Sequence, residues 1–334
     1  MKLTNMHGAV SLQALGAMLH DCVFKLNGKQ VRPLYDPPWR SDHGGNLDAL
    51  PPILRKMGSE WPCVPFGRTQ EQLQLPTEWD VSESAADWDS WVHGYSSNSD
   101  WQLEQLNART LRATIHYPEQ TPILHLERTV ELLEDMPGIA LSLTIHAHRE
   151  TRFPLGLHPI LSMAGAASGT LRLAVPDHAR VWSFPVDVEP GRGHFSPSQQ
   201  DCPPGQVRTS TGDITDIRLL PPEGRTEDLL LLTRTDGAVG LVNAAQGYTT
   251  TVRWDTEHLP GCLLWISNGG RDAYPWNGRV QALGVEPVAS AFDLGMAHSL
   301  AHDTPLARHG LQTSISVLPG TPFACKYTIL ITPN

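Results

Sequence analysis

The chain lacks the features of a nucleic-acid-binding or membrane-spanning protein. Its 334 residues include 25 Lys and Arg against 35 Asp and Glu, so the net charge is −10, and no basic stripe is visible. This balance disfavours nucleic acids and anionic membrane surfaces as partners and leaves neutral small molecules open. No stretch reaches the ~20 apolar residues that a membrane span needs. The apolar run from Gly8 to Leu19 is interrupted by Gln13 and is predicted to form early strands, not a signal peptide.

The chain also lacks the short motifs of several enzyme classes. It contains no G-x-G-x-x-G motif and no P-loop, which argues against a nucleotide cofactor, and no G-x-S-x-G nucleophile elbow. His298 and His302 have i, i+4 spacing but lack the glutamate of an H-E-x-x-H zinc motif. His146 and His148 form an H-x-H pair, which a half-buried polar strand face explains as well as a metal site. The sequence therefore predicts neither a cofactor nor a metal.

Cysteine is scarce. The chain has five, at positions Cys22, Cys63, Cys202, Cys262 and Cys325. Their odd number, their wide spacing and the lack of a C-x-x-C pair indicate reduced thiols rather than a disulfide framework. We therefore expect a cytoplasmic location.

Helical signals are thin, whereas two-residue alternation recurs along the chain. Leu141, Leu143 and Ile145 alternate with Ser142 and Thr144, a pattern typical of a half-buried antiparallel strand. Similar alternation occurs at 170–175, 250–254 and 323–331. Gly and Pro, 28 residues each, suit many strands joined by turns. The sequence predicts an all-β fold, a large antiparallel β-sandwich with few short helices, and a single domain over residues 1–334.

Three segments carry weaker signals. Ile123 to Leu133 fits a helix and a strand equally well. Leu47 to Lys56 follows a polar opening and is predicted to hold short helices. Val188 to Gly212 is rich in Pro, Gly, Ser and Gln, which predicts a long loop or irregular ribbon within the domain.

Two short strings carry the clearest chemistry. In Gly156–Pro159 the neighbouring proline stiffens the backbone around His158, whose imidazole suits proton transfer at neutral pH. In Gly284–Pro287 the carboxylate of Glu286 emerges from an apolar run, which is costly unless the group is paired or lines a cavity. Together they offer the acid and the base needed at the anomeric centre of a sugar. A loop histidine and a solvated edge-strand glutamate are the plain alternatives.

Other side chains are candidates for sugar binding. Arg68 follows an aromatic-rich turn and could hold a sugar oxygen, although it could equally cap backbone carbonyls. His93 could donate a hydrogen bond to a substrate, with a solvated loop histidine as the default. Trp276, like Trp88 and Trp91, offers a face on which a pyranose could stack, although a core role suits any single tryptophan.

In their order along the chain, these strings resemble the aldose 1-epimerase (galactose mutarotase-like) family. After an early apolar strand pair the succession reads Pro33-Leu34-Tyr35, Pro38-Trp39, Glu60-Trp61-Pro62, Phe66-Gly67-Arg68, His93-Gly94, Gly156-Leu157-His158-Pro159 and Val285-Glu286-Pro287. Each string is short, so the specificity rests on their succession over residues 12–331. The resemblance implies a large antiparallel β-sandwich with a sugar cleft on a concave face. It is compatible with a monomer or a homodimer.

The resemblance also implies an enzyme, an isomerase that interconverts the anomers of an aldose by acid–base ring opening. Glu286 would be the base that takes the proton from the anomeric hydroxyl, and His158 the acid that protonates the ring oxygen. Arg68 and His93 would hold substrate oxygens. The Trp/Asp/Ser stretch before His93 departs from the family pattern near the expected substrate, so the identity of the sugar stays open.

A third carboxylate usually binds the substrate in this family. Asp216, in an Asp-hydrophobic-Arg string, is the best match, with Asp213 as its competitor. Two other functions remain open on the same fold, a non-catalytic carbohydrate-binding protein and a sugar hydrolase or lyase. A pure binder needs neither His158 nor Glu286. A glycosidase would need two carboxylates about 5–9.5 Å apart, so Asp216 close to Glu286 would favour it.

Overall fold

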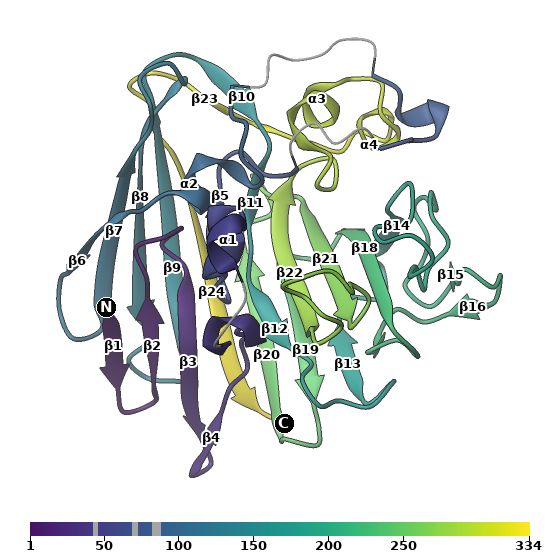
Figure 1. Ribbon diagram of the computed structural model, residues 1–334, viewed down its shortest axis with the longest axis horizontal. Helices are drawn as coiled ribbons and strands as arrows, with labels where there is room; N and C mark the ends of the chain where they lie inside the picture. The colour runs from purple at the N-terminus through teal and green to yellow at the C-terminus, as the bar shows by residue number, and fades with distance from the viewer. Residues whose placement is uncertain (43–45, 69–72, 82–87) are drawn as a thin grey trace.

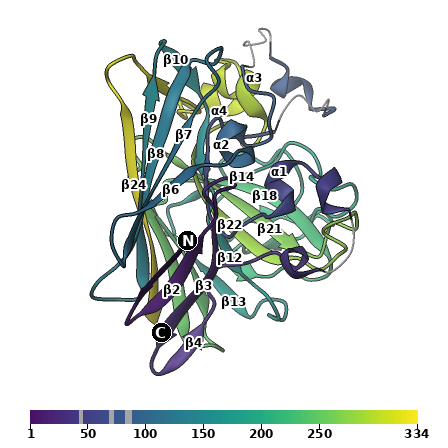
Figure 2. The ribbon, with the colours of Figure 1, turned by 60° about the vertical axis from the view of Figure 1, so that its left-hand side comes forward.

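The computed structural model describes residues 1–42, 46–68, 73–81 and 88–334, and most of its regular structure is antiparallel strand (Figure 1). Two broad sheets form the layers of a sandwich. Figure 2 shows the sheet that contains β8, β9 and β24 on one side and the sheet that contains β18, β21 and β22 on the other. The predicted all-β sandwich with few short helices is therefore confirmed.

The larger sheet has nine strands within the described residues. In spatial order they are β17 (Leu219–Leu220), β13 (Leu171–Ala174), β19 (Ala238–Asn243), β20 (Tyr248–Trp254), β24 (Phe323–Pro333), β9 (Gly138–Ala147), β8 (Ile123–Leu132), β7 (Thr110–His116) and β6 (Gln102–Gln105). In β9 the predicted alternation holds, because Leu141, Leu143 and Ile145 are buried while the residues between them are partly exposed. The ambiguous segment at 123–133 becomes β8, because its alternate apolar residues face the core and its backbone pairs with β9.

The second sheet positions the candidate site. Its strands are β14 (Arg180–Ser183), β18 (Thr226–Thr233), β21 (Gly261–Asn268), β22 (Gln281–Ala289), β11 (Leu155–Leu157) and β5 (Pro62–Cys63), with β12 (Ile160–Ser162) also paired to β22. β18, β21 and β22 are buried along almost their whole length. These three strands therefore have protein on both faces, which fits the apolar runs at 229–232 in β18 and 262–266 in β21.

Smaller elements complete the chain. An N-terminal sheet contains β1 (Lys2–Asn5), β2 (Gly8–Leu12), β3 (Leu19–Leu26) and β4 (Lys29–Val31), and two short ribbons pair β10 (Thr151–Phe153) with β23 (Ile315–Val317) and β15 (Val207–Arg208) with β16 (Ile214–Thr215). The helices are α1 (Pro52–Arg55), α2 (Gly94–Asn98), α3 (Gly295–Leu300) and α4 (Pro305–Arg308), with 3-10 turns at Pro38–Ser41, Leu47–Ala49 and Thr77–Trp79.

Two of the weaker sequence signals are also confirmed. Leu47 to Lys56 holds a 3-10 turn and α1, and the segment from Val188 to Gly212 is irregular apart from β15. The five cysteines are all free thiols. Among the residues that the structure describes, no helix has the length and apolar character that a bilayer crossing requires.

Two hydrophobic clusters lie on opposite faces of the second sheet. One fills the space between the two sheets and includes Leu157 and Val285. The other lies on the far face and includes Trp61, Trp265 and Trp276. Because side chains alternate along a strand, the neighbours of Val285 in β22 point toward the second cluster. Glu286 therefore faces an aromatic layer rather than the centre of the sandwich.

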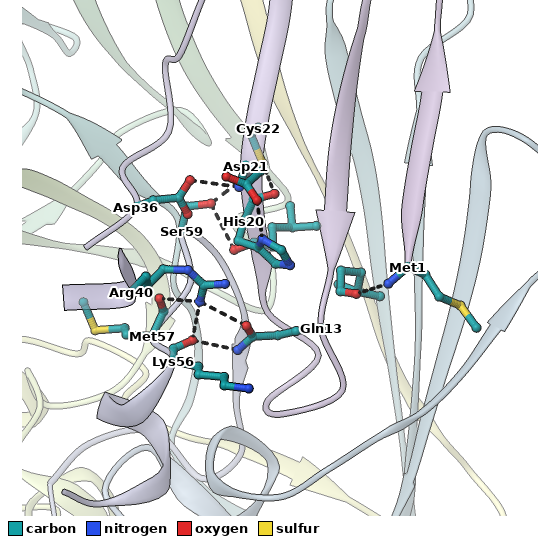
Figure 3. A network of polar contacts seen from close by, with 12 residues as sticks. Met1, Gln13, His20, Asp21, Cys22, Asp36, Arg40, Lys56, Met57 and Ser59 are labelled. Atoms are coloured by element: carbon teal, nitrogen blue, oxygen red, sulfur yellow. Dashed lines mark hydrogen bonds and ion pairs between the residues drawn. The ribbon is translucent and has the colours of Figure 1, made fainter. Parts of the chain in front are cut away.

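A polar network attaches the N-terminal sheet to the segment that follows α1 (Figure 3). The guanidinium of Arg40 donates to the carbonyls of Lys56 and Met57, at 2.7 and 3.0 Å, and to the side-chain oxygen of Gln13 at 3.0 Å. Gln13 in turn donates to the Lys56 carbonyl at 2.7 Å. The network holds Met57, which lines the candidate site, against the strands at the start of the chain.

Candidate active site

The central residues meet because one antiparallel register runs along β22. β11 and β12, which flank residue 158, both pair with β22 in the same register. Gly156 of β11 pairs with Val288, and Ile160 of β12 pairs with Gly284. His158 lies between β11 and β12, so this register places it opposite Glu286. Directly opposed residues have Cβ atoms about 4.5–5.5 Å apart and share a face of the sheet. Accordingly, Nε2 of His158 lies 3.5 Å from Oε1 of Glu286.

Burial perturbs both members of this pair. His158 is 7% exposed and Glu286 1% exposed. Burial raises the pKa of the Glu286 carboxyl well above its usual range, and the negative charge of Asp293 adds to this. Burial lowers the pKa of the His158 imidazole well below its usual range, and His93 acts in the same direction. Both shifts favour the uncharged forms, a protonated carboxyl beside a neutral imidazole, so the proton of the pair has to move to the imidazole before Glu286 can act as a base.

Trp61 covers one face of the His158 ring. Their ring centroids are 4.1 Å apart with an angle of 19° between the planes, and the His158 N–H donates to the Trp61 carbonyl at 2.9 Å. Glu60, the residue before Trp61, accepts hydrogen bonds from Nη2 of Arg128 at 2.7 Å and from the hydroxyl of Tyr327. Both donors belong to the larger sheet, so this buried network fixes the backbone of Trp61 to the opposite layer.

The pair faces a cavity of about 450 Å³. Five residues predicted from the sequence line it: Arg68, His93, His158, Trp276 and Glu286. Apolar side chains form much of the remaining wall, among them Ile53, Leu54, Met57, Leu229, Leu263 and Trp265. A concave, largely apolar site with a few convergent polar groups is typical of small-molecule binding.

His93 is held at the start of α2 as a neutral donor. Its backbone adopts a left-handed conformation with φ of 57°, its N–H donates to the Gly67 carbonyl at 2.7 Å, and its Nδ1 accepts from the Gly67 N–H at 3.4 Å. Burial lowers the pKa of His93 to about 4. A neutral ring that accepts at Nδ1 carries its proton on Nε2. The ring packs on Phe66, and a Cβ added at Gly156 would lie 2.1 Å from the Phe66 ring, so this glycine makes the packing possible.

Arg68 contacts a carboxylate that the sequence analysis did not single out. Its Nε and Nη2 donate to Oδ2 of Asp293 at 3.1 and 2.6 Å, and its backbone N–H donates to the Asp293 carbonyl at 2.7 Å. Oδ1 of Asp293 is buried and has no hydrogen-bond partner among the described residues. Asp293 also lines the cavity, so it offers a hydrogen-bond acceptor to a ligand.

Arg271 is a second charged residue that sequence reasoning missed. It lines the cavity, and its guanidinium carbon lies 4.7 Å from the ring centroid of Trp276 and 5.8 Å from that of Trp265. Its Nε lies 2.7 Å from Oε1 of Glu227, an ion pair without the alignment of a hydrogen bond. Glu227 is fully buried and also accepts from Nε1 of Trp265 at 2.6 Å and from Oγ of Ser267 at 2.8 Å.

A sequence signal for Glu227 did exist. Like Glu286, it is a carboxylate joined to an apolar run, here residues 229–232, and such a group has to be paired or line a cavity. Nothing comparable marks Arg271, which lies outside the named strands. Its place beside Trp265 and Trp276 follows only from the tertiary fold.

The structure does not bring Asp216 to the cavity. Its carboxylate accepts from Nε of Arg218, at 2.8 Å to Oδ1 and 3.0 Å to Oδ2, beside the short ribbon of β15 and β16. The prediction that Asp216 is the third substrate-binding carboxylate is therefore corrected. Its carboxylate binds Arg218, two residues later in the same string, and does not line the cavity. Trp88 and Trp91 are likewise absent from the cavity lining, and Trp91 is 42% exposed.

Within the described residues, one group of side chains has the spacing of metal ligands, His125, Glu127 and His146. None of the three lines the cavity.

Comparison with known proteins identifies the fold. No protein-family model matches the chain. No curated protein sequence matches it either. Several solved structures match over nearly their whole length. The protein Slr1438 from Synechocystis has a TM-score of 0.64 at 14% identity, with 100% of this chain and 96% of that chain covered.

Two further matches carry informative names. A GalM/aldose epimerase homologue from C. elegans has a TM-score of 0.61 at 12% identity, with 100% and 98% of the two chains covered. A putative aldose 1-epimerase from Escherichia coli K12 has a TM-score of 0.59 at 13% identity, with 100% and 98% covered. This chain therefore has the galactose mutarotase-like fold, and the resemblance noted in the sequence is confirmed at the level of the fold.

Proposed function

We propose that the chain is an aldose 1-epimerase-like isomerase that interconverts the anomers of a sugar in this cavity. The observation that carries the proposal is the 3.5 Å approach of His158 Nε2 to Glu286 Oε1 at the cavity wall. Ring opening of a hemiacetal takes a proton from one oxygen and gives a proton to another, and both oxygens are bonded to the same carbon. An acid and a base for this reaction therefore have to be close neighbours.

The proposed reaction follows from this placement. Glu286 takes the proton of the anomeric hydroxyl, His158 gives a proton to the ring oxygen, and the bond between C1 and the ring oxygen breaks. Rotation about C1–C2 followed by reclosure gives the other anomer, and the two groups exchange roles during closure. The carboxyl gains one proton while the imidazole loses one, so the pair carries the same number of protons throughout. Each placed proton transfer contributes roughly 10²–10⁴-fold in rate.

The remaining polar groups of the cavity suit a sugar. His93 presents its Nε2–H as a donor, and Asp293, rather than Asp216, supplies the third carboxylate through its Oδ1. Arg68 positions Asp293. Trp276 lines the cavity and is the candidate face for stacking a pyranose.

The hydrolase alternative depended on Asp216 lying close to Glu286, and Asp216 does not line the cavity. Asp293 does line it, but Arg68 holds one of its carboxylate oxygens. The alternative of a sugar-binding protein without activity is an outcome of the test below. Its weakness is that binding alone requires no acid–base pair, whereas His158 and Glu286 are both retained at high desolvation cost.

The test is NMR measurement of anomer exchange with a panel of aldoses. We expect exchange above the spontaneous rate with at least one sugar and a loss of roughly 10²-fold or more in Glu286→Gln. Asp216→Asn is the matched control, because it removes a carboxylate outside the cavity, and its rate should equal that of the wild type. Undiminished exchange in Glu286→Gln would remove the proposed base. Saturable sugar binding without exchange in the wild type would establish the binding protein instead.

A further inference from the structure

A second group of chemically active side chains lies on the larger sheet, on the face turned away from the core. It contains three histidines and one glutamate from three adjacent strands: His116 of β7, His125 and Glu127 of β8, and His146 of β9. The ladder pairs His116 with His125 and His125 with His146. The neighbouring residue in β8, Leu126, is fully buried, so its flanking residues point outward.

Three members of this group have the spacing of metal ligands. The rings of His125 and His146 stack with centroids 4.1 Å apart and planes at 12°. Nε2 of His125 lies 3.3 Å from Oε1 of Glu127. One ligand atom from each of the three residues lies within 4.8 Å of the other two. His116 is more distant, with its ring centroid 5.3 Å from that of His125.

Histidine binds a metal in its neutral form. Two stacked imidazoles would repel each other if both were protonated. The side chain of His125 is 18% exposed and that of Glu127 46% exposed, so the group is open to a cation from solvent.

We propose that His125, Glu127 and His146 bind a divalent zinc-type cation that clamps β8 to β9. Two imidazoles and one carboxylate are a ligand set that zinc accepts, with its fourth position taken by water. Zinc–ligand bonds of about 2.0–2.1 Å in a tetrahedron place ligand atoms about 3.3–3.4 Å apart. The 3.3 Å between His125 and Glu127 already meets this spacing. The ligand atom of His146, which lies within 4.8 Å of the other two, would have to move closer by rotation of its ring when zinc binds.

The proposal gives His146 of the H-x-H pair metal-binding partners other than His148. His146 would act with residues of the neighbouring strand and not with His148, because β9 ends at Ala147 and His148 is exposed beyond it. The partners come from β8, which the sequence alone did not identify as a strand. His148 therefore provides a matched control in which a nearby, exposed histidine is removed.

The clamp is independent of the proposed enzyme activity. None of its three residues lines the cavity, and the cavity contains residues from other strands and loops. Variants of the clamp should exchange anomers at the wild-type rate. Failure of one proposal would therefore leave the other unaffected.

The experiment is a titration of the full-length chain with zinc chloride in competition with a chromophoric chelator. We expect one zinc per chain, bound roughly tenfold or more weakly in His125→Gln and in His146→Gln, because even indirect partners of a metal site are worth 10–100-fold. Zinc should also raise the melting temperature of the wild type and of His148→Gln, but not of the double variant His125→Gln/His146→Gln. Equal zinc affinity in the double variant, or no zinc bound by the wild type, would overturn the proposal.

Discussion

The side chain of Glu286 folds back over Gly284, two residues earlier on the same strand. A Cβ added at Gly284 would lie 2.3 Å from Oε1 of Glu286 and 3.0 Å from the Cβ of Trp265. Both positions belong to the face of β22 that meets the cavity. The absence of a side chain at Gly284 is therefore a requirement for the carboxylate to reach His158.

The first prediction concerns this glycine. Gly284→Ala should displace the Glu286 carboxylate and lower anomer exchange by roughly 10²-fold, because a shift of about 1 Å at a catalytic group costs that much. The measurement is NMR exchange with the best sugar of the panel. Gly205→Ala is the control, since its added Cβ would make only ordinary contact, 3.4 Å from a flexible arginine side chain. Equal rates in the two variants would contradict the packing argument.

The second prediction is a gain in stability when the buried carboxyl is neutralised. The folded-state pKa of Glu286 is raised, so the unfolded chain ionises first as pH rises through the usual carboxyl range, and the folded state loses relative stability. Each unit of difference between the two pKa values is worth about 1.4 kcal/mol. Glu286→Gln removes this titration, and its melting temperature should exceed that of the wild type by a margin that grows above pH 4.5.

Thermal unfolding at pH 5 and pH 8 measures this margin. The exposed residue Glu257 supplies a control, because Glu257→Gln removes a carboxylate that is already in water. A Glu286→Gln variant that is less stable than the wild type at pH 8 would show that the carboxylate is stabilised by contacts, not strained by burial.

The third prediction is the pH profile of exchange. His158 and Glu286 together hold one proton in the active form. Activity therefore falls at low pH, when His158 is protonated and the pair holds two protons, and at high pH, when the pair holds none. The lowered pKa of His158 places the acidic limb of kcat/KM below pH 6.5. Asp293→Asn removes a negative charge that raises the pKa of Glu286. The alkaline limb of the variant's pH profile should therefore lie at lower pH than that of the wild type. An acidic midpoint at or above 6.5 would argue against His158 as the titrating group.

The fourth prediction tests the buried network behind Trp61. Glu60→Gln leaves the guanidinium of Arg128 without its counter-charge, although Arg128 is only 1% exposed. Loss of one partner of a buried ion pair costs about 3–5 kcal/mol. The exposed pair of Arg112 and Glu104 on the same sheet is the comparison, and Glu104→Gln should change stability little.

Urea unfolding of both variants measures the difference. Comparable midpoints for Glu60→Gln and Glu104→Gln would show that the buried pair contributes no more than a surface pair. The Glu60 variant should also exchange anomers more slowly, because Trp61, the next residue, stacks on His158.

Much of the strand content could be read from two-residue alternation. In β9 and β24 the apolar residues face the core on one side only, so their spacing appears directly in the sequence. The pattern was less informative at β8, where apolar residues also recur at helical spacing. Its pairing with β9, a contact between different segments, decided the conformation.

The same distinction applies to the site. Glu286 was predicted as a site residue because a charged group in an apolar run is costly to bury. His158 was predicted because the neighbouring proline stiffens its backbone. Asp216 was assigned by its resemblance to a motif, but its carboxylate has a local partner in Arg218 that satisfies it. Asp293 and Arg271 carried no local signal, because their roles depend on Arg68 and Trp276 from distant segments.

The sequence by itself determined the alternation of apolar and polar residues, and with it an antiparallel β fold and two residues suited to proton transfer. Periodicity is a local property, so each strand records it. The tertiary structure alone decided the register of β22 against β11 and β12, which places His158 beside Glu286. A shift of one residue in that register would turn one member of the pair to the other face of the sheet, and no local pattern of residues specifies against it.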